Sequence, residues 1–159
     1  MGLQLEIPPG WNYEEPERVL SVILTPWRGQ DKENVSLSIW SNFNNDLTLE
    51  EALQNELNRL IARWSIDEVV ILQTVEHSKL NNLDIVKITI EAPMDTENQE
   101  NIDRLSTFQP MEIFVLDADD RFIQIIFRQS TINSDLNKAG QAIIDSIQTY
   151  PACSFCTEP

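Results

Sequence analysis

The sequence has few of the residues from which common active sites are built. It contains four glycines, two cysteines and one histidine in 159 residues. The glycines are not spaced to cradle a phosphate, which excludes the P-loop and the dinucleotide-binding fingerprint. No apolar run reaches the roughly 20 residues of a membrane-spanning helix. No signal peptide is visible, so we expect a cytoplasmic protein, although a chain whose leader had been removed would look the same.

The scarce histidine and cysteines form no recognisable site. His77 has no second histidine or nearby cysteine with which to share a metal, and we expect it to be structural. Cys153 and Cys156 have CxxC spacing, but they follow the last predicted helix, whereas a redox pair normally begins one. We expect residues 152–159 to form a flexible tail; a metal shared between two chains is the alternative. The sequence therefore predicts no cofactor and disfavours an enzyme.

Acidic residues outnumber basic ones by 26 to 11, which gives a formal net charge of −15. This charge repels nucleic-acid phosphates and anionic membranes, so we expect no nucleic-acid partner and no membrane insertion. It would suit a basic partner, but a well-solvated surface that resists self-association explains it at least as well. The acidic segment DADDR, with Asp119 and Asp120, lacks the glycine and glutamate of a calcium loop and predicts a hairpin turn.

The hydrophobic pattern predicts one α+β domain over residues 1–151, because a chain of this length buries one sizeable core but not two. Strand and helix patterns follow in the order β-β-β-α-β-β-β-β-α. This order favours an antiparallel sheet of about six to seven strands packed with two helices. The predicted strands are residues 3–7, 18–27, 35–43, 69–77, 84–92 and the two halves of 111–129, and the helices lie within 47–64 and 133–150.

Both helices carry start signals in the sequence. Thr48 and Glu51 have the spacing of a capping box, and the apolar stripe that follows is interrupted only by Glu56. The second helix begins at an Asn-Ser cap and ends before Pro151. The polar segment from Asp95 to Ser106 is longer than most connections and predicts a mobile or functional loop.

The stretch VSLSIWSNF alternates apolar and polar side chains, as a half-buried strand does. Its three aliphatic residues are predicted to face the main core, while the opposite side carries two serines and a tryptophan. A large apolar residue on a polar side is typical of a partner site. The core side is Val35, Leu37 and Ile39, and the other side is Ser36, Ser38 and Trp40.

Three segments together resemble the PsbP-like sandwich superfamily: LEIPPGW near the N-terminus, LTLEEAL at the first helix, and AIIDSIQTY at the last. The best anchors are Pro9 to Trp11 and Ser146 to Ile147. The superfamily includes PsbP-like photosystem accessory proteins, a Ran-binding nuclear-import factor, and the bacterial DcrB-like group with the EagR chaperones of type VI secretion effectors. The resemblance implies an α/β/α sandwich and a non-catalytic role in binding other proteins.

We therefore expect a protein-binding module, with a cytoplasmic adaptor or chaperone of the DcrB/EagR kind as the leading interpretation. One alternative is a PsbP-like photosystem accessory protein. Another is a small-molecule or lipid carrier, whose cavity would lie between sheet and helix and be lined by Ile61 and Trp64. An enzyme with an unfamiliar site is the third class.

We hypothesise that the polar side of residues 35–43 binds an apolar segment of another protein or a second copy of the chain. The candidate residues are Trp40, Phe43, Trp27, Ser36 and Ser38. They are joined on this face either by Lys87, Thr89 and Glu91 or by Phe122, Gln124 and Ile126. In the alternative interpretation one helix packs on each side of the sheet, Trp40 is core, and the partner site lies in the loop at 95–106.

Overall fold

The computed structural model describes residues 2–14, 21–26, 35–43, 46–64, 70–93, 108–118, 121–130 and 133–150. No helix in these ranges is long and apolar enough to cross a membrane. The elements are β1 (Gly2–Gln4), β2 (Trp11–Glu14), β3 (Ser21–Pro26), β4 (Ser36–Phe43), α1 (Leu49–Trp64), β5 (Val70–Ile71), β6 (Glu76–Leu80), β7 (Leu83–Pro93), β8 (Phe108–Asp117), β9 (Arg121–Arg128), α2 (Ser134–Asp145) and β10 (Gln148–Tyr150).

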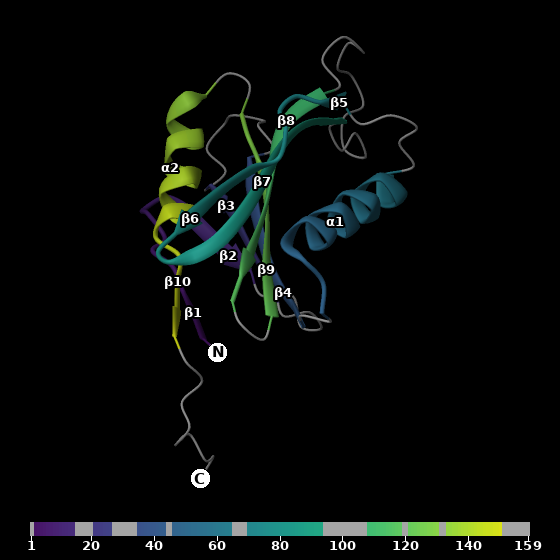
Figure 1. Ribbon diagram of the computed structural model, residues 1–159. Coiled ribbons are helices and arrows are strands. Elements are labelled where there is room, and N and C mark those ends of the chain that lie inside the picture. Colours follow the sequence, from purple (N-terminus) through teal and green to yellow (C-terminus); the bar gives the residue numbers. More distant parts are fainter. Residues whose placement is uncertain are drawn as a thin grey trace.

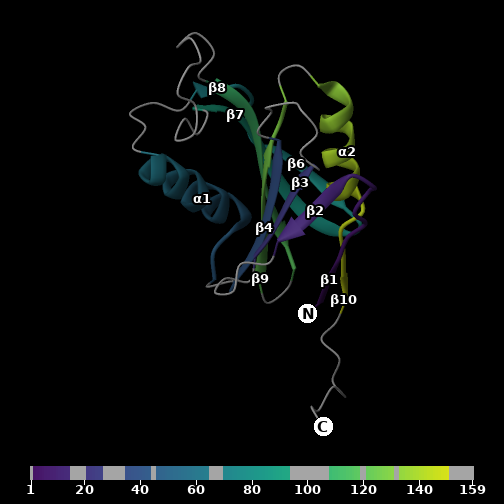
Figure 2. The ribbon, with the colours of Figure 1, turned by 180° about the vertical axis from the view of Figure 1, so that it is seen from behind.

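One eight-stranded antiparallel sheet forms the centre of the molecule. Its strands lie in the order β2-β3-β4-β9-β8-β7-β5, and β6 also pairs with β7. The two helices lie on opposite faces of this sheet (Figures 1 and 2). The predicted α+β fold with two covering helices is confirmed. The eight strands do not match the seven predicted ones one for one. The strand predicted at 3–7 lies outside this sheet, β2 was not predicted, and the segment predicted as a single strand at 69–77 contains β5 and the start of β6.

Each helix buries its own apolar stripe against one face of the sheet, so there are two cores. The α2 side includes the aliphatic residues of β4, and the predicted inward orientation of Val35, Leu37 and Ile39 is confirmed. The α1 side joins α1 to β7, β8 and β9. The residues at the centre of the first core are Leu37, Leu116, Ile125, Phe127, Ile143 and Ile144, and those of the second are Leu53, Leu60, Val86, Ile90, Ile113 and Val115.

The helix starts follow the signals in the sequence. Thr48 and Glu51 form the predicted capping box, since each backbone N–H donates to the other's side chain, at 2.8 and 3.2 Å. Asn133 caps α2 by accepting from the N–H groups of Asp135 and Leu136. Both caps satisfy backbone donors that a helix otherwise leaves without a partner.

Three predicted elements differ in the structure. The first strand, predicted at 3–7, is β1 at Gly2–Gln4 and is not part of the main sheet. The strand at 69–77 is divided into β5 and β6, because the N–H groups of Leu72 and Gln73 both donate to the carbonyl of Thr89 and form a bulge. The last helix ends at Asp145, five residues before the end that Pro151 predicted. Residues 148–150 instead pair with β1, which lies outside the main sheet.

The two anchor segments of the sequence resemblance meet at the end of α2. The backbone N–H of Glu6 donates to the Ser146 hydroxyl at 2.8 Å. Gly10 has a φ of 90°, which lets the chain turn so that Trp11, only 8% exposed, enters the α2-side core beside Ile147. These contacts explain why the segments PGW and SI matter to this fold, although 140 residues separate Glu6 from Ser146.

The β6–β7 turn gives a test of how this end of the molecule is held. Asn81 and Asn82 both have positive φ, at 47° and 72°, as a tight two-residue hairpin requires. The Asn81 side chain also donates to the carbonyls of Asp145 and Ile147, at 3.1 and 2.8 Å. We expect Asn81→Gly to cost about 1 kcal/mol of unfolding free energy, because glycine keeps the turn and loses both bonds.

Asn82→Gly is the matched control, since no side-chain bond is described for Asn82 and glycine tolerates its φ equally well. Urea denaturation of both variants measures the difference. Equal stability of the two would show that Asn81 does not hold the end of α2.

Candidate functional site

The α1-facing side of β4 is the part of the sheet that carries most of the predicted site. α1 packs chiefly against β7 and β8 rather than β4. Ser36, Ser38 and Trp40 are therefore only partly buried and Asn42 is exposed. We call these four residues the β4 ledge. Across the strand pair they face Arg128, Ile126, Gln124 and Phe122 of β9, respectively.

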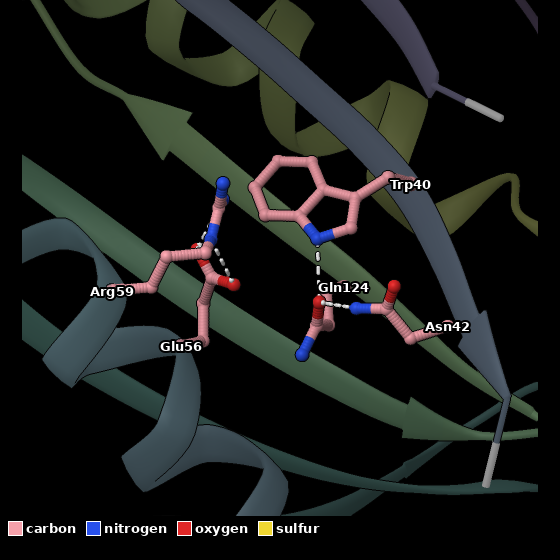
Figure 3. Close-up of polar contacts among 5 residues, drawn as sticks. All are labelled: Trp40, Asn42, Glu56, Arg59 and Gln124. Atoms are coloured by element: carbon pink, nitrogen blue, oxygen red, sulfur yellow. Dashed lines mark hydrogen bonds and ion pairs between the residues drawn. The ribbon is translucent and has the colours of Figure 1, made fainter. Parts of the chain in front are cut away.

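Trp40 is held in place by a polar neighbour on β9. Its indole N–H donates to Oε1 of Gln124, and the amide of Asn42 donates to the same oxygen at 2.6 Å. Gln124 is only 5% exposed. Because one acceptor fixes both donors, the orientation of the indole ring is set from β9 (Figure 3).

On the other side of the ring, α1 contributes an ion pair. Glu56 is 2% exposed, and Arg59 holds its carboxylate through Nη2 at 2.6 Å and Nε at 3.0 and 3.2 Å. The Arg59 guanidinium carbon lies 4.8 Å from the centre of the Trp40 ring, within cation–π range. Trp40, Asn42, Glu56, Arg59 and Gln124 thus form one group between α1 and β4, which we call the Trp40 cluster (Figure 3).

The structure brings part of the predicted site together. Ser36, Ser38 and Trp40 share the β4 ledge, and Trp40 packs at the margin of the α1-side core. Phe43 ends β4, but its side chain lies outside the described residues, as do Trp27 and the loop at 95–106. One helix covers each face, yet Trp40 is not fully buried.

The register decides which residues join the β4 ledge. The second of the two sets considered is correct, since Phe122, Gln124 and Ile126 lie across from the ledge. Lys87 lies on the opposite face, beside Phe114 and Ile144 of the α2 side.

Three members of the Trp40 cluster, Asn42, Glu56 and Arg59, were not predicted as site residues, whereas Gln124 was named in one of the two sets considered. Glu56 was visible as the one charge in an apolar stripe, and Arg59 three positions later has the spacing of an ion pair on a helix. These two could have been found from the sequence. Asn42 could not, and the set with Gln124 could not be chosen over the other one, because both depend on the β4–β9 register.

Among the described residues, the scarce metal-binding residue types do not cluster. His77 is exposed on β6, with Nε2 3.6 Å from Glu50 of α1. In the ranges that the structure describes, no three His, Cys, Asp or Glu side chains are grouped to hold a metal ion. The acidic pairs at 95–97 and 119–120 and the CxxC at 153–156 lie outside those ranges.

A second surface feature is a groove of about 200 Å³ between α2 and the β6–β7 hairpin. Lys87 crosses its floor and pairs with Glu76 at 3.2 Å and Glu112 at 3.5 Å. Partial burial alone lowers the pKa of Lys87, but hydrogen bonding and the charges of the two carboxylates outweigh it and hold the pKa above its usual 10.5. The groove is lined by Glu76, Ser78, Lys79, Leu80, Ile85, Lys87, Phe114, Gln141, Ile144 and Asp145.

The raised pKa makes stability depend on alkaline pH. A folded pKa above the unfolded value of about 10.4 means that the protonated amine stabilises the fold fully below pH ~10.4. This stabilisation is lost as pH rises through the folded pKa. We expect Lys87→Met to be less stable than wild type at neutral pH and the gap to close at alkaline pH, measured by urea midpoints.

Lys79→Met provides the control for that series, because Lys79 pairs with Asp84 while 69% exposed. Exposed pairs contribute little. A wild-type advantage over Lys87→Met that stays constant across the alkaline range would contradict the ion-pair explanation.

The strand order, with one helix on each face, defines a PsbP-like α/β/α sandwich, as the sequence resemblance implied. Cyanobacterial PsbP (CyanoP) from Synechocystis has a TM-score of 0.65 to this chain at 11% identity, covering 94% of this chain and 87% of CyanoP. LpqN, involved in cell envelope biogenesis of Mycobacterium tuberculosis, has a TM-score of 0.59 at 11% identity, covering 94% of this chain and 83% of LpqN.

A protein from Bacteroides thetaiotaomicron also has a TM-score of 0.59, at 12% identity over 94% of this chain, but the chain spans only 46% of that protein's length. No protein-family model matches the sequence, and no curated protein does. At these identities the likeness shows the fold alone.

Proposed function

We propose that this chain is a non-catalytic protein-binding module and that the β4 ledge is its binding surface. The observation that supports the proposal is that α1 does not fully cover the ledge. Ser36, Ser38 and Trp40 remain partly exposed in the middle of a sheet whose neighbouring strand, β9, is buried. A tryptophan among small polar residues is typical of surfaces that bind other proteins.

The finer assignment is a cytoplasmic adaptor or chaperone of the DcrB/EagR kind. It is supported by the net charge of −15, which disfavours nucleic-acid and lipid roles, and by the low cysteine content expected in a reducing compartment. The PsbP-like fold agrees with this assignment but does not select it. Another protein is the proposed partner, and a second copy of the chain is the alternative occupant of the ledge.

A carrier is less well supported. Ile61, one of the residues proposed to line its cavity, packs against the α1-side core instead. Four of the ten residues that line the groove beside α2 are charged and four are apolar, whereas sites for apolar ligands are lined mostly by apolar side chains.

Site-specific cross-linking tests the ledge. A photoreactive amino acid at Ser38 is expected to trap a discrete protein in native lysate, and excess unlabelled wild type should compete it away. The same group at Lys138, exposed on α2 on the opposite face, is the control. Excess unlabelled Ser38→Arg should fail to compete the capture away, because it places a long charged side chain on the ledge. Identical products from both positions, or competition by Ser38→Arg as strong as that by wild type, would contradict the proposal.

A further inference from the structure

The ion pair in the Trp40 cluster is unequally buried. The Glu56 side chain is 2% exposed, while its partner Arg59 is 50% exposed. The carboxylate is thus a fixed part of the interior, and the cation reaches it from the solvent side. An incoming cation could take the place of Arg59, but no incoming anion could take the place of Glu56.

The position that Arg59 occupies has two walls. The Glu56 carboxylate accepts three N–H contacts from the guanidinium. The face of the Trp40 ring forms the second wall, 4.8 Å from the guanidinium carbon. Because Gln124 fixes the indole N–H, this wall keeps its orientation when Arg59 leaves. We call the space between Glu56 and the ring the cation seat.

We propose that the cation seat binds an arginine side chain of the partner protein, and that Arg59 fills the seat in the free protein. This inference rests on the proposed function, since Trp40 of the β4 ledge forms one wall of the seat. A partner segment lying along Ser36 and Ser38 would bring a side chain to the seat by the next position on the same face.

Exchange of one guanidinium for another conserves the interactions that a buried carboxylate needs. Removing a cation from a buried carboxylate is costly, but replacing it with an equivalent one keeps the charge paired. Arg59 is on the outer side of the seat and returns to solvent when displaced. The net charge of −15 favours the approach of a basic segment.

Arginine fits the seat better than lysine does. A guanidinium is planar, can contact both carboxylate oxygens at once and stacks on an aromatic face. Arg59 makes all of these contacts in the free protein. The class of partner is therefore a protein that presents arginine in an extended segment.

The variant Arg59→Gln empties the seat and tests the inference directly. The probe is a blocked Gly-Gly-Arg-Gly-Gly peptide, and the readout is the NMR signal of the Trp40 indole N–H, assigned with Trp40→Phe. We expect saturable binding to Arg59→Gln at least about tenfold tighter than to wild type. The variant Lys138→Gln removes one positive charge far from the seat and is expected to behave as wild type.

Two further comparisons identify the groups involved. The same peptide with citrulline in place of arginine, and the double variant Arg59→Gln with Glu56→Gln, should each lose the tighter binding. Binding to Arg59→Gln that is no tighter than to Lys138→Gln, or that leaves the Trp40 signal unmoved, overturns the inference.

If Arg59→Gln does not fold, the same peptide is titrated into the wild type. The peptide should then move the Trp40 indole signal and the Arg59 Nε–H signal together, because Arg59 leaves Glu56; no change in the Arg59 signal overturns the inference. If the peptide does not bind as expected but cross-linking at Ser38 succeeds, the β4 ledge is supported as a binding surface and only the cation seat is rejected. If the peptide binds in the cation seat but nothing is cross-linked at Ser38, the cation seat is supported and the β4 ledge is rejected.

Discussion

Gly140→Val is expected to lower the free energy of unfolding by about 3 kcal/mol. A Cβ at Gly140 would come within 3.0 Å of two ring carbons of Phe127. Phe127 is fully buried at the centre of the α2-side core, so its ring has no free space into which to move. The absence of a side chain at Gly140 lets α2 lie close on β9. Chemical denaturation measures the loss, which arises although valine favours a helix more than glycine does.

Two controls separate the close contact from other effects of valine. Ala142→Val, at an exposed position of the same helix, is expected to cost only about 0.5 kcal/mol. Combining Gly140→Val with Phe127→Ala should be less destabilising than the sum of the single changes by about 2 kcal/mol, because the new side chain fills part of the space that the ring leaves. Strictly additive stability losses would mean that the side chain introduced at position 140 and the Phe127 ring do not compete for the same space.

The sequence was most informative where a local pattern decides the structure. The capping box at Thr48 and Glu51 and the inward alternation of Val35, Leu37 and Ile39 depend only on neighbouring residues, and both are present. The hairpin turn between β6 and β7 belongs to the same group, because adjacent asparagines accept positive φ.

Features that depend on long-range pairing were not accessible from one sequence. The apolar pattern of α2 continues to Ile147, yet the helix ends at Asp145 because residues 148–150 pair with β1 at the other end of the chain. Gly140 was visible only as a glycine without a phosphate-binding neighbour. Its role depends on Phe127, whose place beneath α2 follows from the tertiary packing.

The candidate site shows the same division. Trp40 stood out because it broke the polar pattern of its strand, and the structure places it on the ledge beside Ser38. The reason for its position is Gln124, which the sequence places 84 residues away. A buried glutamine in a strand of otherwise apolar inward residues is the signal that would identify such a support in another sequence.

The second large effect is expected from Gln124→Leu, at about 2 kcal/mol of lost stability. Leucine has nearly the same volume but no acceptor, so the indole N–H of Trp40 loses the bond that the structure gives it. Asn42 loses the same acceptor, but it is exposed and can turn to water. The cost therefore falls mainly on Trp40, which is partly buried.

A double-mutant cycle distinguishes this cost from simple repacking. Trp40→Phe removes the N–H, so in its background Gln124→Leu no longer leaves a donor without an acceptor and should cost at least about 1 kcal/mol less than in the wild type. Acrylamide should also quench the fluorescence of Trp40 more strongly in Gln124→Leu, because the ring is no longer fixed. The Trp40 signal is obtained by subtracting the spectrum of Trp40→Phe. An equal cost in both backgrounds would show that Gln124 stabilises β9 by packing alone, and the cation seat would then lack a fixed wall.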